Sequence, residues 1–261
     1  MGAYIYAIAN RKGGSGKTTT TYSISAGLAR KGYKVLMVDM DPQGDLTEWA
    51  GYDPYEKIQV YDALVGYETI KNTTTQISEN LDLVPTDATL WNIMDDYSTK
   101  KEKDLVLLKN ALKEVEEDYD FIFIDTPPSF GVLTYNSYIA AKNGLIVTTD
   151  TSTFAIRAME EVIDAVENIR ELNKDAYPVG VLVTRYNGRS KSMRSLRDTT
   201  IEFGEYWNIP VYETAIRNTS AVTDAINNGE SIYSVKNSMA ANDYMKFIEE
   251  FLQKEGIEEN K

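Results

Sequence analysis

A glycine-rich loop between a predicted strand and a predicted helix is the feature that most restricts how this chain can fold. Residues 4–9 are rich in Tyr and Ile, as in a buried strand, and residues 18–30 repeat apolar side chains at helical spacing. Between them, Gly13, Gly14 and Gly16 let successive backbone N–H groups point at one anion. A strand, a glycine-rich loop and a helix in this order are the context that a phosphate-binding P-loop requires.

The residues around these glycines complete the predicted phosphate site. Lys17 is expected to contact the β- and γ-phosphates of ATP, and Thr18 is positioned to give its hydroxyl to Mg²⁺. Thr19 could reach the α-phosphate from the first helical turn, and Ser15 lies within the loop itself. We therefore expect ATP and Mg²⁺ to bind along residues 13–19. The alternative is a turn that only joins a strand to a helix.

Short β-rich runs alternate with helical patterns along the rest of the chain, which is typical of a parallel sheet. The sequence therefore predicts an α/β fold with a single doubly wound, mostly parallel sheet and helices on both faces. Residues 1–254 would form one ATPase domain, with 53–80 as small helices and loops and 255–261 as an acidic, disordered tail. Strands are predicted at residues 4–9, 35–38, 81–84, 121–124, 145–148, 179–183 and 211–212, and helices at 18–30, 105–115, 156–169, 193–203 and 244–252.

The composition excludes several kinds of chemistry. Acidic residues outnumber basic ones by 40 to 27, so a uniformly basic nucleic-acid binder is excluded and any DNA contact must be local. Because the chain has neither cysteine nor histidine, catalysis must rest on carboxylates, lysines and metal. No apolar run approaches the roughly 20 residues that span a bilayer, so we expect a soluble, cytoplasmic protein without membrane contact.

Carboxylates follow two of the predicted strands. Asp39 and Asp41 come directly after residues 35–38, and two residues apart in an extended chain they point the same way. Asp125 follows residues 121–124 and is expected to hold Mg²⁺ through water. Ligands of open α/β sheets bind at the carboxyl ends of the strands, where all three acids lie. A helix cap is the structural alternative for each acid alone.

The loop also carries a second lysine. Arg11 stands where the ordinary motif has glycine, and residues 12–18, KGGSGKT, resemble the deviant Walker A motif of the ParA and MinD ATPases. Residues 39–44, 125–129 and 225–232 extend the resemblance to ParA-type partition ATPases over most of the chain. The resemblance implies an ATP-sandwich homodimer in which Lys12 crosses to the partner's nucleotide, as an arginine finger does. A lysine that is merely solvated is the alternative.

The same resemblance implies roles for other residues. Asp41 would orient or activate the attacking water, and Asp39 would support the magnesium shell. Thr184, Arg185 and Ile216, in loops that follow predicted strands, would contact adenine. The expected catalytic residues are therefore Lys12, Lys17 and Asp41, and the expected metal-binding residues are Thr18, Asp39 and Asp125.

A local basic cluster interrupts the acidic composition. Residues 185–197 include five basic side chains and no acidic one. Three-residue steps place some of them on one face of a predicted helix, which suits contacts with the phosphates of a DNA backbone. An ordinary solvated helix face is the alternative. The candidate DNA-binding residues are Arg189, Lys191, Arg194 and Arg197, with Lys236 and Lys246 as an extension.

The resemblance to ParA-type proteins also implies a function. Such a protein would be a Mg²⁺-dependent ATPase of weak turnover, and its ATP-bound dimer would bind DNA on the nucleoid without sequence preference. With a centromere-binding, ParB-type partner it would segregate plasmid or chromosomal DNA. No helix-turn-helix precedes the loop, so the short form is expected.

Two alternatives to partition stay open. One is a MinD-like positioning ATPase, although the chain ends acidic instead of in a basic amphipathic helix. The other is a nucleotide-gated adaptor that hardly hydrolyses ATP and recruits partners to DNA or to a cell pole.

Overall fold

Seven strands of the described residues form one sheet. The computed structural model describes residues 2–53, 58–96, 101–150 and 154–258. The strand order is β3-β4-β2-β5-β1-β6-β7, and every neighbouring pair is parallel except β3 and β4. This confirms the predicted mostly parallel α/β sheet. The strands are β1 (Tyr4–Ala9), β2 (Val35–Asp39), β3 (Thr75–Ser78), β4 (Leu81–Val84), β5 (Phe121–Asp125), β6 (Leu145–Asp150) and β7 (Pro178–Thr184).

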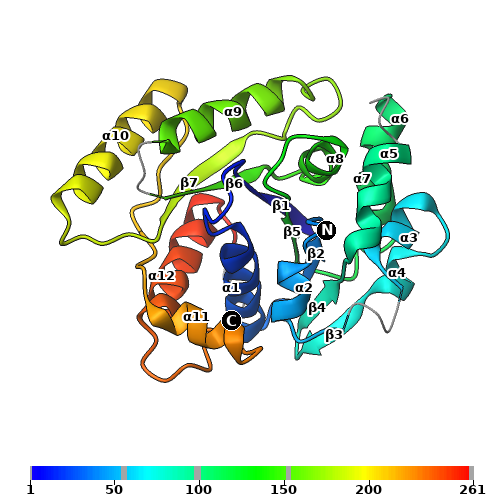
Figure 1. The fold of residues 1–261 in the computed structure, drawn as a ribbon, viewed down its shortest axis with the longest axis horizontal. Coiled ribbons are helices and arrows are strands. Elements are labelled where there is room, and N and C mark those ends of the chain that lie inside the picture. The colour runs from blue at the N-terminus through cyan, green and yellow to red at the C-terminus, as the bar shows by residue number, and fades with distance from the viewer. Residues whose placement is uncertain (1, 54–57, 97–100, 151–153, 259–261) are drawn as a thin grey trace.

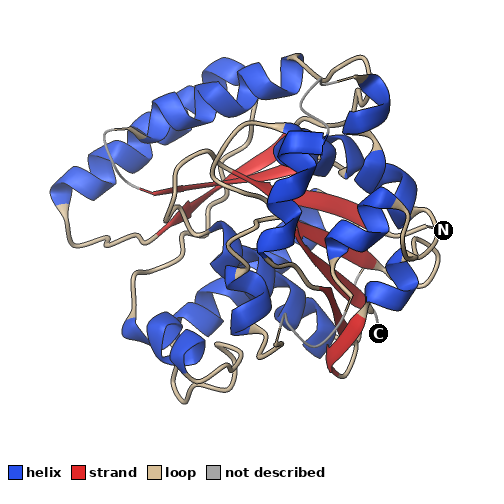
Figure 2. Cartoon of the chain, turned by 45° about the vertical axis from the view of Figure 1, so that its right-hand side comes forward, coloured by secondary structure: helices blue, strands red, loops and turns tan. Residues whose placement is uncertain are grey.

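Helices cover both faces of the sheet, as Figures 1 and 2 show. α1 (Lys17–Arg30) and α12 (Met239–Lys254) lie on one face, and α8 (Val132–Ala140) and α9 (Ala155–Glu167) lie on the other. None of the helices that the structure describes is long and apolar enough to cross a membrane. The other helices are α2 (Asp45–Trp49), α3 (Val60–Val65), α4 (Ile70–Thr73), η1 (Ala88–Trp91), α5 (Asn92–Asp96), α6 (Glu102–Leu105), α7 (Leu107–Leu112), α10 (Lys191–Trp207) and α11 (Ser220–Asn227).

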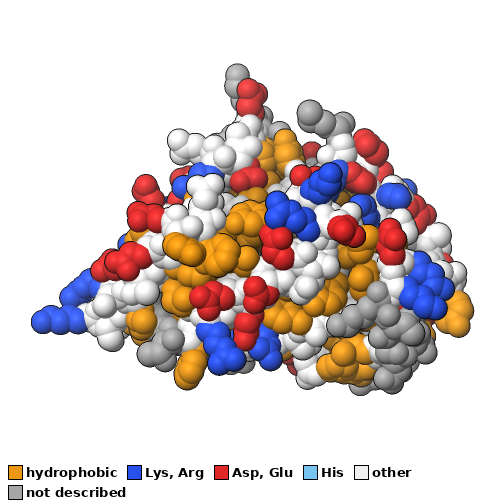
Figure 3. Space-filling view, turned by 90° about the horizontal axis from the view of Figure 1, so that it is seen from above, with side chains coloured by type: hydrophobic (Ala, Val, Ile, Leu, Met, Phe, Trp, Pro, Cys, Tyr) orange, Lys and Arg blue, Asp and Glu red, His pale blue; other side chains and the backbone are white. Residues whose placement is uncertain are grey.

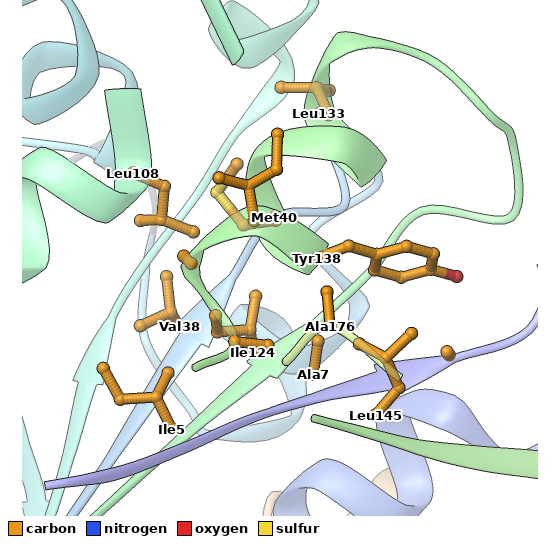
Figure 4. Packing of buried hydrophobic residues seen from close by; sticks show 14 of the residues in the cluster. Ile5, Ala7, Val38, Met40, Leu108, Ile124, Leu133, Tyr138, Leu145 and Ala176 are labelled. Atoms are coloured by element: carbon orange, nitrogen blue, oxygen red, sulfur yellow. The ribbon is translucent and has the colours of Figure 1, made fainter. Parts of the chain in front are cut away.

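The central strand β1 supplies side chains to both halves of the core. Ile5 and Ala7 belong to the cluster under α8 and α9, together with Tyr138 (Figure 4). Tyr6 and Ile8 belong to the cluster under α1 and α12. Successive residues of a strand point to opposite faces, so a strand covered on both sides is apolar throughout. This explains why the central strands are continuous apolar runs in the sequence.

Three predicted segments differ from the structure. Residues 53–80, expected as small helices and loops, also contain β3, a short edge strand without a fully buried residue and therefore with little apolar signal; residues 54–57 lie outside the described residues. The predicted strand at 211–212 is wrong, since Val211 forms only an isolated bridge with Val181 in the described chain. The helix predicted at 105–115 is divided between α6 and α7, with a break at Val106.

The sequence analysis does not predict α8. Nearly all of its residues are buried, so the segment lacks the polar face by which an amphipathic helix is recognised. Asn136 within it donates from Nδ2 to the carbonyl of Asp104 at 2.8 Å and accepts from the N–H of Leu108 at 3.1 Å. This buried amide therefore joins α8 to the two helices packed against it.

The segment after α12 is attached to the domain. Tyr6 donates from its hydroxyl to Glu255 Oε2 at 2.8 Å, and Tyr33 donates to the carbonyl of Glu258 at 3.0 Å. Ile257 packs against the core cluster under α1. Residues 255–258 therefore contact the folded domain, and residues 259–261 lie outside the described residues, so the disordered tail stays a prediction.

Gly144, in the turn before β6, provides a test of the fold. Its φ is +107°, and a Cβ there would lie 2.6 Å from the carbonyl oxygen of Tyr177. We expect Gly144→Ala to lower the free energy of unfolding by about 3 kcal/mol, because backbone strain and a clash with main-chain oxygen add. Urea unfolding measures the loss.

Gly32 is the matched control, because its φ is +89° and a Cβ there would meet nothing within 4 Å. Gly32→Ala keeps the backbone strain without the clash and should cost about 1 kcal/mol. Equal losses in the two variants would show that the close approach at Gly144 is not a constraint on the fold.

Candidate nucleotide-binding site

The glycine-rich loop curves from β1 to α1 in contact with the end of β7. Gly14 and Gly16 have φ values of +73° and +88°, in the left-handed region that glycine adopts without steric penalty. A Cβ on Gly16 would lie 3.2 Å from Oγ1 of Thr184, so the loop and β7 approach more closely than most side chains would allow. α1 begins at Lys17, and no described side chain caps its first turn. Its N-terminal N–H groups are available for an anion.

A cleft of about 770 Å³ opens beside this loop. Its lining comes from the loop and the first turn of α1, from the loop after β2, from the end of β7, and from residues 216–227 around α11. The fold therefore brings together residues from both halves of the chain. The predicted site residues that line the cleft are Gly13, Gly14, Gly16, Lys17, Thr18, Thr19, Asp41, Thr184, Arg185 and Ile216, whereas Ser15, Asp39 and Asp125 are buried.

Lys17 is a buried cation near two carboxylates. Burial lowers the pKa of Lys17, and the charges of Asp125 and Asp41 oppose that shift. Burial also raises the pKa of Asp41, against the effect of a hydrogen bond from Gln43 and of the Lys17 charge. A buried charge is stabilised only by groups of opposite sign close to it, and phosphate oxygens would add to the two carboxylates. The cleft is therefore suited to a polyphosphate.

Asp125 has a carboxylate oxygen that fits a metal ion. Burial raises the pKa of Asp125 to about 6, against the effects of the Lys17 charge and of hydrogen bonds from Thr18 and Thr21. Its Oδ1 accepts from the Thr21 hydroxyl at 3.3 Å. Its Oδ2 is buried and has no hydrogen-bond partner among the described residues. Such an atom is costly unless a ligand satisfies it, and a divalent cation or its bound water would do so.

Asp39 is already occupied by hydrogen bonds. Its Oδ2 accepts from the N–H of Thr47 at 3.0 Å and from the Thr47 hydroxyl at 2.7 Å, and its Oδ1 accepts from the N–H of Asp41 at 3.1 Å. Burial and the adjacent Asp125, its partner in the β2–β5 register, raise the pKa of Asp39 well above its usual value. Asp39 therefore holds the backbone of the loop that carries Asp41, and its expected support of the magnesium shell stays a prediction.

Thr184 and Arg185 hold the phosphate loop. Thr184 is buried and donates from Oγ1 to the carbonyl of Ser15 at 2.8 Å. Arg185 donates from an NH1 group to the carbonyl of Gly14 at 3.2 Å, and its φ of +52° is unusual for a residue with a side chain. Both residues also line the cleft. An adenine contact by either one stays a prediction.

The sequence analysis missed the residues that fix the other side of the cleft. Arg217 donates from Nε and NH2 to the two carboxylate oxygens of Asp243 at 2.8 and 2.6 Å, a forked pair that fixes the loop after Ile216. Val222 of α11 and Tyr244 of α12 line the same cleft. Apolar walls with a few fixed polar groups suit a planar base. No local motif marks these positions, since α11 and α12 meet the cleft only in the folded chain.

Lys12 lies away from the cleft. Its ammonium forms an ion pair with Asp150 at the end of β6. It lines a separate hollow of about 400 Å³ with Arg11, Phe154 and Arg157. The two lysines of the loop therefore point to different places, Lys17 into the cleft and Lys12 outside it.

The basic cluster is divided in the structure. Arg189, Lys191 and Arg194 are exposed around the N-terminal end of α10, and Figure 3 shows basic side chains at the left-hand tip, where this helix begins. Arg197 is half-buried. Lys236 and Lys246 are exposed on the loop before α12 and on α12, the helix that covers the opposite face of the sheet.

A glycine loop between a strand and a helix, with a buried lysine and a buried carboxylate that has one unpaired oxygen beside the same cleft, defines a P-loop nucleotide-binding protein. Residues 3–177 match the family model of an AAA domain. The chain is 34% identical over 234 residues to the sporulation initiation inhibitor protein Soj of Bacillus subtilis, covering 87% of this chain and 89% of that protein. It is 30% identical over 259 residues to the chromosome partitioning protein ParA of Caulobacter vibrioides, covering 96% and 94%. The chain belongs to the ParA/Soj family of partition ATPases.

Two solved structures share the fold over nearly the whole chain. Cobyrinic acid a,c-diamide synthase from Mycobacterium smegmatis, with bound ADP and magnesium, has a TM-score of 0.81 and 29% identity, covering 96% of this chain and 94% of that one. A plasmid partition protein from Borrelia burgdorferi bound to AMPPNP has a TM-score of 0.81 and 25% identity, covering 97% and 99%. Both carry a nucleotide on the same fold.

The raised pKa of Asp125 predicts a pH-dependent stability. In the unfolded chain this carboxyl titrates near its ordinary value of about 4, whereas its folded pKa is about 6. The stabilising contribution of the neutral acid is therefore complete below about pH 4 and is lost as the pH rises through 6. We expect Asp125→Asn to stabilise the nucleotide- and metal-free protein at pH 7.5 by on the order of 2 kcal/mol, and not at pH 4.

Urea unfolding of both proteins at the two pH values measures this difference. Mg²⁺ with ATP should stabilise the unmodified protein more than Asp125→Asn, because the variant lacks the carboxylate that a metal would use. Equal stabilisation by the substitution at both pH values would mean that Asp125 carries no unfavourable charge in the folded chain.

Proposed function

We propose that this chain is a Mg²⁺-dependent ATPase that forms a homodimer with ATP, and that the dimer binds DNA without sequence preference in order to partition DNA. The observation that carries the proposal is the placement of two lysines from one loop. Lys17 lies in the cleft near Asp41 and Asp125, whereas Lys12 lies outside that cleft beside Asp150. A lysine turned away from its own nucleotide can act on the nucleotide of another subunit.

ATP and Mg²⁺ are the proposed cofactors. Lys17 and the backbone of the glycine loop would bind the phosphates, as suits a buried ammonium near carboxylates. The Thr18 hydroxyl and the unpaired Oδ2 of Asp125 would hold Mg²⁺. Bound Mg²⁺ neutralises charge on the phosphate oxygens. The nucleotides in the two similar solved structures support this assignment.

Asp41 is the proposed residue for hydrolysis. It lines the cleft, and burial raises its pKa, which makes the carboxylate a better proton acceptor for an attacking water. Its N–H donates to Asp39 at 3.1 Å, and its Oδ1 accepts from the N–H of Gln43 at 3.1 Å. These bonds fix the side chain at the edge of the cleft, where it would orient water.

A two-fold dimer would give Lys12 its role. A two-fold axis that brings Lys12 of one copy to the nucleotide of the second copy also brings Lys12 of the second copy to the nucleotide of the first. The ammonium would then stabilise charge on the phosphoryl oxygens, as an arginine finger does. Because the monomer lacks this cation at its own nucleotide, weak turnover by the isolated subunit is expected.

The DNA surface is proposed at the exposed end of α10. Arg189, Lys191 and Arg194 are exposed there, and a dimer would double the number of phosphates they neutralise. The name of the chromosome partitioning protein ParA, a relative at 30% identity, supports a role in chromosome partition. A centromere-binding, ParB-type protein is the proposed partner, and the nucleoid in the cytoplasm is the proposed location.

A MinD-like membrane role is less well supported. The apolar face of α12 is packed on the sheet through Phe247, Ile248 and Phe251, which are fully buried. A membrane-binding helix needs its apolar face available to lipid. The residues of α12 therefore serve the core.

Lys12→Ala tests the dimer and the DNA surface together. We expect the purified protein to bind non-specific DNA only with ATP, and the variant to lose more than about tenfold in DNA affinity while it keeps ATP binding, because halving the phosphate contacts weakens a salt-dependent complex. DNA binding at two salt concentrations with ATP, ADP or no nucleotide measures this.

Lys174→Ala removes the same charge from an exposed position after α9 and is the control. The partition proposal fails if the unmodified protein binds no DNA under any of these conditions. It also fails in part if Lys12→Ala and Lys174→Ala lose DNA affinity equally, since charge alone would then explain the loss.

Asp41→Ala tests the proposed hydrolytic residue. We expect ATP binding to persist and kcat to fall by about 10² to 10⁴, the usual contribution of a general base or of an oriented water. After a single addition of ATP, the variant should therefore stay bound to DNA longer than the unmodified protein. Phosphate release and dissociation from DNA are the two measurements. Undiminished turnover would remove Asp41 from the mechanism and favour another water-positioning group.

A further inference from the structure

The last residue of β7 and the two residues after it contact both sides of the nucleotide cleft. Thr184 and Arg185 donate to carbonyls of the phosphate loop. The next residue, Tyr186, donates its N–H to the carbonyl of Ile216 at 2.9 Å and accepts from the N–H of Asn218 at 3.2 Å. Ile216 and Asn218 both line the cleft. These three consecutive residues, 184–186, therefore connect the phosphate loop to the loop on the opposite side of the nucleotide cleft.

Arg197 of α10 is bound to this connection. Its guanidinium carbon lies 5.9 Å from the centre of the Tyr186 ring, within the range of a cation–π interaction. It donates from NH2 to the carbonyl of Glu213 at 2.8 Å. Glu213 is itself fixed, because its N–H donates to Glu250 of α12 at 2.7 Å. A guanidinium held between a ring and a carbonyl of its own chain is poorly placed to bind a DNA phosphate.

Arg197 is also the point at which the basic end of α10 is anchored. The buried residues of α10 are Thr200, Phe203 and Gly204, all in the second half of the helix. The first half carries the exposed Lys191 and Arg194. The contacts of Arg197 with Tyr186 and Glu213 join this first half to the residues that border the cleft.

We propose that Arg197 is a positioning residue that couples the nucleotide cleft to the basic end of α10, and not a DNA contact. By bracing Tyr186 and Glu213 it fixes the backbone on either side of Ile216. A nucleotide that orders this loop then also orders the start of α10. The consequence for DNA rests on the proposed function, whereas the consequence for ATP binding does not.

Arg197→Gln tests the brace. We expect the Kd for a non-hydrolysable ATP analogue with Mg²⁺ to rise about three- to fivefold, which corresponds to the loss of one partly exposed cation–π contact. Isothermal titration calorimetry measures it. Arg170→Gln is the control, because Arg170 at the end of α9 makes an exposed pair with Glu167 and its loss changes the charge equally; its Kd should be unchanged.

Arg197→Lys distinguishes a positioning role of Arg197 from a direct DNA contact. It also replaces Arg197→Gln in the test if the glutamine variant does not fold. Lysine serves as a point charge for a phosphate but lacks the planar guanidinium that lies over the Tyr186 ring and donates to the carbonyl of Glu213, so the ATP defect should persist. Tyr186→Leu should raise the Kd for the ATP analogue in the same way. The double variant Arg197→Gln/Tyr186→Leu should bind the analogue no more weakly than Arg197→Gln, because both substitutions remove the same contact between the two side chains. Full additivity would overturn the coupling through Tyr186.

An Arg197→Gln protein that binds the analogue normally but loses DNA affinity, with recovery in Arg197→Lys, would make Arg197 a DNA contact and overturn the proposal. If the unmodified protein binds no DNA, the proposed function fails, while calorimetry still decides whether Arg197 supports the nucleotide site.

Discussion

The buried ammonium of Lys17 is the interaction on which the rest of the site depends. A buried cation requires negative partners nearby, and the strand order supplies one because β1 lies beside β5, with Ile8 paired in register with Asp125. On the other side of β5, Asp39 is the register partner of the same residue. The position of β1 beside β5 therefore brings a carboxylate close to Lys17 and also buries the apolar side chains of β1 on both faces of the sheet.

The residues proposed to act on a nucleotide and the residues that hold them in place are distinct in this cleft. Lys17, Thr18 and Asp41 line the cleft. Asp39 fixes the loop that carries Asp41, and Thr184 fixes the loop that leads into Lys17. Such supporting contacts keep reactive groups in place, and their loss is felt through the groups they hold. Buried acids at strand ends can therefore serve as supports as readily as ligands.

The sequence was sufficient to predict the sheet and the phosphate loop, because the pattern that indicates each of them lies within a short continuous segment of the chain. Central strands are continuous apolar runs, and the glycines and Lys17 stand together in the chain. It was insufficient where a role depends on a distant partner. The bonds that occupy Asp39 come from Thr47, and the contact that engages Arg197 comes from Tyr186. Helix α8 escaped prediction since a helix buried all round has no polar face.

The attachment of the C-terminal segment has a practical geometric consequence. Tyr33, which donates to the carbonyl of Glu258, lies two residues before the amino end of β2, whereas the cleft lies at the carboxyl ends of the strands. Anything joined after residue 258, such as a fluorescent protein or an affinity label, would emerge from the edge of the sheet remote from the nucleotide. We therefore expect a reporter fused at that end to leave nucleotide binding unchanged.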